Sequence, residues 1–222
     1  MASRETLINI GSGASIHQFL SACKSFREII AMDCADQNRE EVQRWLRKEP
    51  GAFDWTLIVK YVCELEGDSE KWPEKEEKIR RALKRYLKCD VTQPNPLAPL
   101  VLPPADCLLS SLCFDGACRD IPTYRSAFRN ISSLLKPGGH LLFYSTLELH
   151  YYIVGQQRFS NIYLEKEMVE EAVRQAGFYV NIKQLLWNTQ TSPTVVMILL
   201  HKLGKTHGTR LLGRITPFLE GA

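Results

Sequence analysis

Two glycines and one aspartate near the start of the chain have the types and spacing to hold a nucleoside. Gly11 and Gly13 follow a strand-like stretch and precede a helix-like one, and without Cβ atoms they allow a tight turn and close backbone approach to a ligand. Asp33 lies 20 residues after Gly13, at the end of a second apolar stretch. A carboxylate there can accept hydrogen bonds from two ribose hydroxyls. These residues indicate a cofactor that contains adenosine.

The residues after the turn distinguish between such cofactors. A dinucleotide fingerprint requires a third glycine three residues after the second, and that position is Ile16. A phosphate-binding loop requires Gly-Lys-Ser/Thr, which the chain lacks. The turn therefore suits an uncharged or amino-acid tail, and S-adenosylmethionine fits. The alternative is an ordinary strand-to-helix turn, because Gly-Ser-Gly alone is a weak motif.

Three later residues could contact the adenine and the methyl-bearing end of S-adenosylmethionine. Asp90 ends a third strand, where its carboxylate can accept from an adenine amino group while the Val91 N–H donates to a ring nitrogen. Ser111 ends a fourth strand and can line the methyl-bearing end. The alternatives are a turn or cap for the aspartate and a backbone-bonded strand-end hydroxyl for the serine.

The elements that position these residues alternate between strands and helices, which predicts an α/β fold with a mainly parallel sheet. The last two strands, separated only by "NTQTSP", must be antiparallel neighbours, so the sheet is Rossmann-like with an antiparallel last strand. Asp36 is the expected N-cap of the helix after the second strand, and "KPGG" at 136–139 is a tight turn. Strands are expected near 6–10, 28–33, 107–113, 140–146, 179–187 and 194–203, with a further strand that spans the end of the 73–88 helix and residues 89–91. Helices are expected after Gly13 and at 36–50, 73–88, 121–136 and 164–178.

Charge and composition exclude several classes of partner. The 222 residues carry a net charge of +3, too small and too mixed to indicate nucleic acid. The helix at 73–88 places three pairs four residues apart, which predicts ion pairs on a solvated face: Glu74 and Lys78, Glu76 and Arg80, and Glu77 and Arg81. The apolar runs are too short to span a membrane, and no signal sequence is visible, so a cytoplasmic protein is expected.

The seven cysteines predict reduced thiols rather than disulfides or a metal site. Their number is odd and no CxxC pair occurs. Neither Cys113 nor Cys118 is paired with a histidine in a way that predicts a nucleophile, and the five histidines show no metal-ligand spacing. We therefore expect no metal, and we assign no general base.

The chain as a whole resembles a family of small-molecule methyltransferases. The stretches "DQNREEVQRWLRKEPGAFDWT", "EKEEKIRRALKRYLKCDVTQPNPLAP", "LPPADCLLSSLC", "SLLKPGGHL" and "EEAVRQAGF" are similar to those of the nicotinamide, phenylethanolamine and indolethylamine N-methyltransferases. The resemblance runs from about residue 6 to 203. "GGHLLFYSTL" and "NPLAP" favour the indolethylamine branch, which acts on amines and thioethers.

The resemblance implies a Rossmann-like, S-adenosylmethionine-dependent methyltransferase domain at 1–203. The last stretch, 204–222, lacks clear periodicity, which predicts a loosely held tail. The resemblance also implies two sets of contact residues. The cofactor contacts are Gly11, Gly13, His17, Asp33, Asn38, Asp90, Val91 and Ser111. The acceptor contacts are Ser145, Leu149, Tyr152 and Asn161. His17 stands where relatives usually have a tyrosine, and Tyr152 has simple packing as its alternative.

Several positions depart from the family pattern. Relatives carry a helical lid ahead of the first strand, and the chain is expected to lack it. Asn9 and Ala14 replace the acid and the proline that flank the glycine turn, and Ser145 replaces an acid of the nicotinamide enzyme, which argues against nicotinamide as substrate. The expected function is methyl transfer to a small aromatic, tryptamine-like amine or a thioether, by a monomer. The alternative is a lidless, catalytically impaired relative that binds cofactor weakly or serves as a scaffold.

Overall fold

The computed structural model describes residues 5–186 and 194–202. The chain divides into two compact units, which are described separately: unit 1 comprises residues 1–88 with 207–222, and unit 2 comprises residues 89–206. The predicted tail at 204–222 and the end of the strand expected at 179–187 fall outside the described residues.

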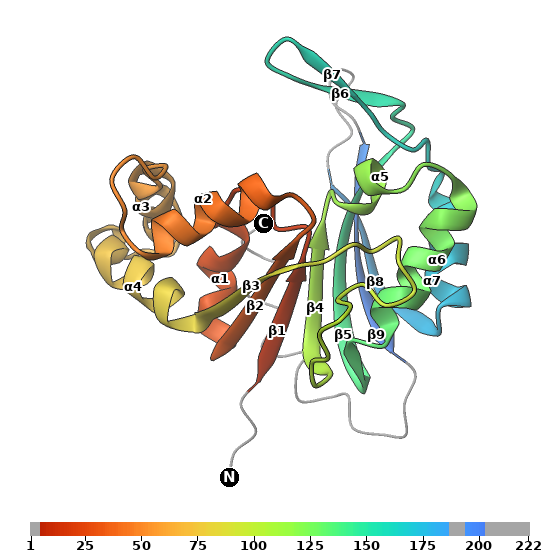
Figure 1. Ribbon diagram of the computed structural model, residues 1–222, viewed down its shortest axis with the longest axis horizontal. Coiled ribbons are helices and arrows are strands. Elements are labelled where there is room, and N and C mark those ends of the chain that lie inside the picture. Colours follow the sequence, from red (N-terminus) through yellow and green to blue (C-terminus); the bar gives the residue numbers. More distant parts are fainter. Residues whose placement is uncertain (1–4, 187–193, 203–222) are drawn as a thin grey trace. The chain divides into compact units, whose positions relative to one another are not determined.

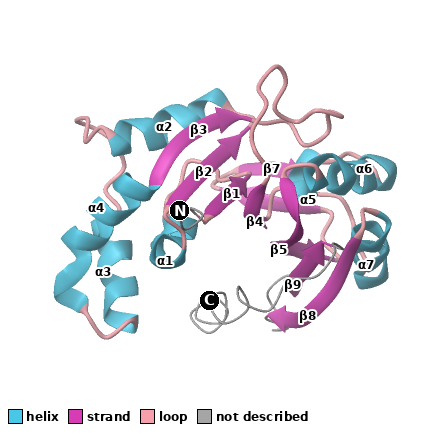
Figure 2. Ribbon diagram, turned by 90° about the horizontal axis from the view of Figure 1, so that it is seen from below, coloured by secondary structure: helices cyan, strands magenta, loops and turns pink. Residues whose placement is uncertain are grey.

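Unit 1 is built on three parallel strands in the order β3-β2-β1. Helices α1 and α2 lie on opposite faces of this sheet (Figure 2). The residues from Leu7 to Ile10 and from Ile29 to Asp33 are all buried, so the first two strands form the core of the unit. The elements of unit 1 are β1 (Thr6–Ile10), α1 (His17–Ser25), β2 (Glu28–Asp33), α2 (Asp36–Leu46), α3 (Thr56–Leu65), the 3-10 helix η1 (Ser69–Lys71), α4 (Trp72–Ala82) and β3 (Leu83–Lys88).

Unit 1 differs from the sequence prediction in three places. The N-cap of α2 is Ala35, and Asp36 is already its first helical residue. Helix α3 was not predicted. The predicted helix at 73–88 ends at Ala82, and the chain continues directly as β3, so Tyr86 faces the core from a strand and not from a helix. Strand β3 pairs with β2 in parallel, and Tyr86 is the register partner of Ala31.

The main sheet of unit 2 has four described strands in the order β4-β5-β9-β8. β4 and β5 are parallel, whereas β9 runs antiparallel to both β5 and β8, which confirms the predicted antiparallel last strand. Helices α6 and α7 pack against each other and cover one face of the strands (Figure 1). The elements of unit 2 are β4 (Ala105–Ser111), α5 (Phe114–Ala117), α6 (Ile121–Ser132), β5 (Leu135–Leu147), β6 (Tyr151–Val154), β7 (Gln157–Ser160), α7 (Lys166–Gln175), β8 (Phe178–Leu186) and β9 (Thr194–Lys202).

Strand β5 begins earlier than predicted. The expected turn at 136–139 lies inside the strand, as an irregularity where the register with β4 shifts between Ala105 and Cys107. Gly139 fits there because a Cβ atom would lie 2.7 Å from Leu135 Cδ1 and 2.9 Å from the Asp106 carbonyl oxygen. A second difference is the β6–β7 hairpin, a separate two-stranded sheet that was not predicted. In Figure 1 it extends beyond the carboxyl ends of β4 and β5.

The core of unit 2 is an aromatic cluster between α5, α6 and β5. Its four rings contact one another at centroid distances from 4.8 to 6.1 Å, and all four are fully buried: Phe114, Tyr124, Phe128 and Phe143. Strand β9 is tied to α6 by Lys202, whose Nζ donates to the carbonyl oxygens of Ser132 and Leu135 at 2.5 and 2.7 Å. These contacts hold the helix layer against the sheet.

The seven cysteines are free thiols, as predicted, and five of them are buried. In the part of the chain that the structure describes, no helix is long and apolar enough to cross a membrane. The alternation of strands and helices, with mainly parallel pairing, confirms the α/β class.

Candidate cofactor and acceptor sites

The glycine turn of unit 1 is held by backbone hydrogen bonds to β2. Gly11 and Gly13 adopt φ of 72° and 63°, a region that residues with a Cβ atom rarely enter. The N–H groups of Gly11 and Ser12 both donate to the Met32 carbonyl oxygen, at 2.8 and 3.0 Å. Ile16, where a dinucleotide fingerprint would have its third glycine, is completely buried. The turn is therefore a rigid backbone feature without the close helix–strand contact that a third glycine permits.

The Asp33 side chain accepts a hydrogen bond from the glycine turn and two more from the residues that follow it. Its Oδ2 accepts from the Gly13 N–H at 2.8 Å, and its Oδ1 accepts from the Ala35 N–H and the Asn38 side-chain amide, both at 2.9 Å. A carboxylate offers about four acceptor positions, so Oδ2 keeps one for a further donor. This arrangement fits one ribose hydroxyl directly. The predicted second hydroxyl would have to replace one of the protein donors.

Of the two other predicted contact residues of unit 1, Asn38 forms a hydrogen bond with Asp33 and His17 does not. Asn38 lies in contact with Asp33 and orients its carboxylate. His17 does not take part: it begins α1, and its Nδ1 lies 2.5 Å from the Ser15 hydroxyl. Two residues that the sequence did not indicate also support the turn. Arg39 donates to the Asp33 carbonyl oxygen at 2.8 Å, and the Tyr86 hydroxyl donates to the Gly13 carbonyl oxygen at 2.5 Å.

Asn9, which stands in place of the family's acid, is completely buried beneath the turn. Its amide donates to the Gln18 side chain, and its oxygen accepts from the Ser12 hydroxyl. The amide supplies a donor and an acceptor at once, which a carboxylate cannot. The substitution is thus accommodated by the neighbouring side chains of the turn and of α1.

Asp90 does not end the third strand as predicted, because β3 ends at Lys88; it forms a local turn instead. Its Oδ1 accepts from the N–H and the hydroxyl of Thr92 at 3.0 and 2.6 Å, which is the alternative that the sequence left open. The Val91 carbonyl oxygen accepts from the Asn130 amide at 2.9 Å, so this loop is anchored to α6. No described residue accepts from the Val91 N–H. Asp90 and Val91 as adenine contacts stay predictions.

Ser111 ends β4 as predicted, opposite Tyr144 of β5. The next residue, Leu112, has a φ of 53° although it is not a glycine, and its N–H donates to the Tyr144 carbonyl oxygen at 3.0 Å. Its side chain is 55% exposed. A bulky residue in this left-handed region costs free energy. The strained backbone turns the chain sharply at the carboxyl end of β4, where Ser111 was expected to line a ligand.

A buried carboxylate connects most of the predicted acceptor residues. Asp115, on α5, is 2% exposed. Its Oδ1 accepts from the Ser145 hydroxyl at 2.8 Å, and its Oδ2 accepts from the N–H and the hydroxyl of Thr146 at 2.8 and 2.9 Å. The Asn161 amide donates to the Thr146 hydroxyl oxygen and the Leu149 carbonyl oxygen at 3.0 and 3.1 Å. Ser145, Leu149 and Asn161 therefore belong to one hydrogen-bonded network.

The electrostatics of this network are set by burial. Burial raises the pKa of the Asp115 carboxyl, and its hydrogen bonds to Thr146 and Ser145 oppose that rise. Neither Asp115 nor Thr146 was a predicted site residue. The nearest sequence signal is the "FDGA" stretch between two predicted elements, and it has no periodicity that marks a buried acid.

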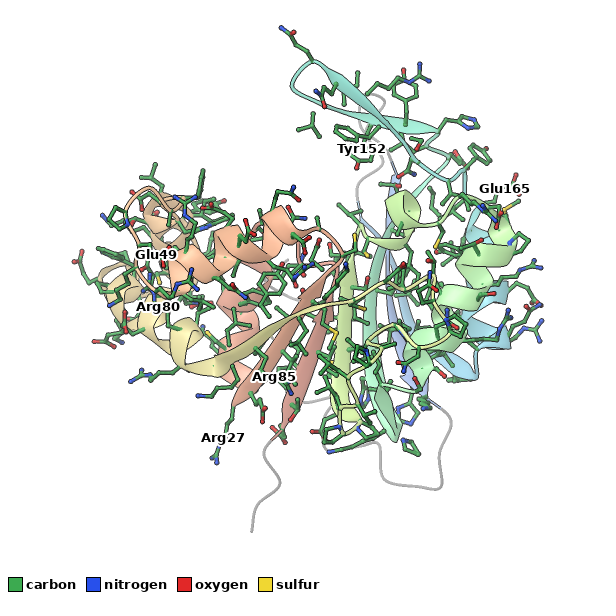
Figure 3. All side chains as sticks on the ribbon, in the orientation of Figure 1. Arg27, Glu49, Arg80, Arg85, Tyr152 and Glu165 are labelled. Atoms are coloured by element: carbon green, nitrogen blue, oxygen red, sulfur yellow. The ribbon has the colours of Figure 1, made fainter. Side chains whose placement is uncertain are left out.

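Tyr152 lies on the β6–β7 hairpin. Its ring stacks on Phe159 with centroids 5.3 Å apart and planes inclined by 15°, and it is 41% exposed. A Cβ atom added at Gly116 of α5 would lie 3.8 Å from the Tyr152 hydroxyl oxygen, so the hairpin and α5 are close at this point. Figure 3 shows Tyr152 beneath the hairpin, on the side that faces α5. Ser145 and Tyr152 thus lie next to α5, and Asn161 links Leu149 to Thr146, which donates to Asp115.

Metal chemistry has no candidate site in residues 5–186 and 194–202. No group of three or more His, Cys, Asp or Glu side chains in these ranges can hold a metal ion. The site chemistry available to the described residues is hydrogen bonding, charge and apolar contact.

The fold is that of the Rossmann-like methyltransferases. A solved S-adenosylmethionine-dependent methyltransferase from Methanosarcina mazei superposes with a TM-score of 0.63 at 11% identity, over 91% of this chain and 95% of that chain. The sequence matches the model of the NNMT/PNMT/TEMT family over residues 1–200. The chain therefore belongs to this methyltransferase family.

Two branches of the family are almost equally similar to the chain. The nicotinamide N-methyltransferase of Sus scrofa is 57% identical over 188 residues, which are 85% of this chain and 71% of the relative. The indolethylamine N-methyltransferase of Oryctolagus cuniculus is 55% identical over 187 residues, 84% of this chain and 70% of the relative. These identities confirm the predicted family and do not distinguish the indolethylamine branch that the sequence motifs favoured.

Proposed function

We propose that the chain is an S-adenosylmethionine-dependent N-methyltransferase whose acceptor is a small aromatic, tryptamine-like amine or a thioether. The observation that carries the proposal is the arrangement of Asp33 with its donors Gly13, Ala35 and Asn38, which we call the Asp33 cradle. In this cradle one acceptor position is left on Oδ2. Membership of the NNMT/PNMT/TEMT family supports the reaction type.

The chain's own residues bind and orient the reactants. S-adenosylmethionine supplies an activated methyl group on a sulfonium, so no residue has to activate the donor. Asp33 holds the ribose, and Gly11 and Gly13 allow the backbone to approach the amino-acid tail. Asp90, Val91 and Ser111 are the proposed contacts for the adenine and the methyl-bearing end. Orientation of this kind contributes up to about 7–11 kcal/mol in the best intramolecular models.

The acceptor side depends on the network around Asp115. An acceptor nitrogen must present a free lone pair, so an amine has to lose its proton before transfer. Ser145 itself carries no charge where the resemblance implies an acid in the nicotinamide enzyme, and its hydroxyl donates to the Asp115 carboxyl, whose pKa is raised by burial. Tyr152 presents an aromatic face on which an aromatic acceptor can stack. The serine supports an amine or thioether acceptor over nicotinamide.

Calorimetry with S-adenosylhomocysteine tests the cofactor assignment, and methyl transfer tests the acceptor class. We expect binding, followed by turnover of tryptamine or a simple thioether in preference to nicotinamide. Absence of binding would exclude the enzyme function. Binding without turnover of any of the three acceptors would favour the alternative, a catalytically impaired relative. Turnover of nicotinamide alone would overturn the acceptor assignment and leave the cofactor assignment intact.

A further inference from the structure

Unit 1 has a cavity at the end of its strands opposite the Asp33 cradle. The cavity has a volume of about 570 Å³ and lies where β1 and β2 begin and where α1 and α4 end. Figure 3 shows Arg27 at this end of the unit. Buried side chains of Cys23, Phe26 and Ala82 contribute to its lining. The charged residues of its wall are five cations and one carboxylate: Lys24, Arg27, Lys78, Arg81, Lys84 and Glu5.

Four of the five cations that line this cavity form no ion pair with a described residue, whereas several other cations of the unit do. Arg80, for example, binds Glu76 at 2.9 Å, and Lys48 binds Glu77 at 2.8 Å. In the cavity, Lys24 binds Glu66 at 2.6 Å. The other four have no ion pair with any residue in the described part of the chain: Arg27, Lys78, Arg81 and Lys84.

The sequence predicted a different arrangement for two of these residues. Helical spacing pairs Glu74 with Lys78 and Glu77 with Arg81, but neither pair forms among the residues that the structure describes. Glu77 binds Lys48 and Arg80 instead, at 2.8 and 3.0 Å. Lys78 and Arg81 therefore remain available on the cavity side of α4, and the charge run is only in part a solvated, self-paired face.

The helix ends that point at the cavity offset only part of the positive charge of its four unpaired cations. The carboxyl-terminal ends of α1 and α4 point partial negative charges at the cavity, each equivalent to about half an elementary charge. Those two ends and Glu5 together offset roughly two of the four unpaired cations. Glu28, the next carboxylate along the chain, does not line the cavity. An excess of about two positive charges remains, which favours an anion that carries at least two negative charges.

We propose that this cavity binds a compact oligophosphate. Its volume falls within the range of about 300–1,000 Å³ that small-molecule sites occupy. Two guanidinium groups and two ammonium groups match closely spaced phosphate oxygens, the first as bidentate donors and the second as point charges. All four side chains are exposed, so binding is moderate in affinity and falls with ionic strength. The site is separate from the Asp33 cradle and does not rest on the proposed methyl transfer.

Calorimetry of the full chain with inorganic tripolyphosphate at low salt tests the proposal. The double variant Arg27→Gln/Arg81→Gln should bind roughly tenfold more weakly, since each exposed cation contributes a fraction of a kcal/mol to every phosphate contact. The matched control is Arg85→Gln/Lys88→Gln, which removes the same charge from β3. Neither control residue lines the cavity or forms an ion pair with a described residue. The control should bind as the unsubstituted chain does.

Three further measurements distinguish the source and the place of binding. Adenosine triphosphate should bind about as well as tripolyphosphate, because the triphosphate carries the contacts, and S-adenosylhomocysteine should not compete with either. Equal weakening by both double variants would show general charge attraction and would overturn the proposal. Competition by S-adenosylhomocysteine would place the phosphates in the cofactor cradle and would also overturn it. Binding of a single-stranded oligonucleotide that is sensitive to Arg27 and Arg81, with no binding of tripolyphosphate, would overturn it as well.

Discussion

The two units each centre on an aspartate, and the two aspartates are held in different ways. Asp33 is fixed by donors from the glycine turn that follows β1, from two residues later and from the next helix, and two of the three donors are backbone N–H groups. Asp115 lies on the short helix α5, and its donors from Ser145 and Thr146 lie about 30 residues away on β5. Two of the three donors to Asp33 lie within five residues of it, whereas the donors of Ser145 and Thr146 reach Asp115 only after tertiary packing. The proposed ribose contact thus depends mainly on residues close to Asp33 in the chain, whereas the proposed acceptor site depends on contacts between a helix and a distant strand.

The largest expected effect is that of Asp33→Ala on cofactor binding. The substitution removes the acceptor for a ribose hydroxyl and leaves three protein donors without a partner. The affinity for S-adenosylhomocysteine, measured by calorimetry, should fall about a hundredfold, since a hydrogen bond to a charged group contributes roughly 1.5–3 kcal/mol. Glu40→Ala on α2, the helix that carries Asn38, should leave the affinity unchanged. Equal affinities of the Asp33 variant and the unsubstituted chain would refute the ribose assignment.

Gly139→Ala tests how far unit 2 depends on the irregular start of β5. The new methyl group would meet Leu135 and the Asp106 backbone below 3.0 Å, so a shift of the backbone is required. We expect the free energy of unfolding, from urea denaturation, to fall by about 2–3 kcal/mol. Gly155→Ala is the control, because it has a positive φ but meets nothing within 4 Å. It should cost about 1–2 kcal/mol, and an equal or larger loss there would contradict the packing explanation.

Asp115→Asn separates acceptor selection from cofactor binding. The variant keeps the shape of the side chain but removes its charge and one acceptor. We expect the KM for an amine acceptor to rise roughly tenfold while the affinity for S-adenosylhomocysteine stays as it was. A loss of cofactor affinity as large as that of Asp33→Ala would mean that the two aspartates do not have separate roles.

The same variant has a pH signature. Because burial raises the pKa of Asp115 above its unfolded value of 3.8, the folded chain holds this proton more tightly than the unfolded chain. Its contribution to stability is present below pH 3.8 and is lost as pH rises through the raised pKa. The free energy of unfolding of Asp115→Asn should lack this decline. Parallel pH profiles of the two proteins would contradict the assigned burial effect.

The smallest effect concerns His140, a buried group of unit 2 without the donors that Asp115 has. Both ring nitrogens lack a partner in residues 5–186 and 194–202, and burial beside His201 lowers the pKa of His140 to about 4. The unfolded state therefore takes up the proton first, and stability is lost as pH falls from 6.5 towards 4. His140→Phe should match the unsubstituted chain at pH 8 and exceed it by about 1 kcal/mol near pH 6. A variant that is less stable at both pH values would show that the ring makes a contact that phenylalanine cannot.

The difference between the units also explains what the sequence could predict. The bounds of β1 and β2 agree with the predicted strands, and the spacing of Gly11, Gly13 and Asp33 marked the cradle, because turns and strand ends depend on neighbouring residues. Asp115 could not be found in this way. Its donors come from β5, and only the packing of α5 against that strand brings them together.

In unit 1, helix α3 was missed and the bounds of β3 were misplaced, both for reasons of periodicity. Helix α3 is apolar on two faces: Val59 is buried, whereas Leu57 and Tyr61 are 80% and 61% exposed, so no single stripe identifies it. In β3 the residues after Ala82 continue the helical spacing of apolar side chains, and the sequence does not show the change from helix to strand. Pairing with β2 determines the strand, and pairing is not visible in a local pattern.

The position of β9 has a consequence for synthesis of the chain on the ribosome. Strand β8 has its hydrogen-bonded neighbour only in β9 among the described strands, and β5 also uses β9 on one side. The three strands of unit 1 are complete when residue 88 has emerged, whereas the sheet of unit 2 has to wait for residue 202. Until residue 202 has been synthesised, the nascent chain exposes two unsatisfied strand edges, and chaperone attachment or misassembly during this interval should concentrate on β5 and β8.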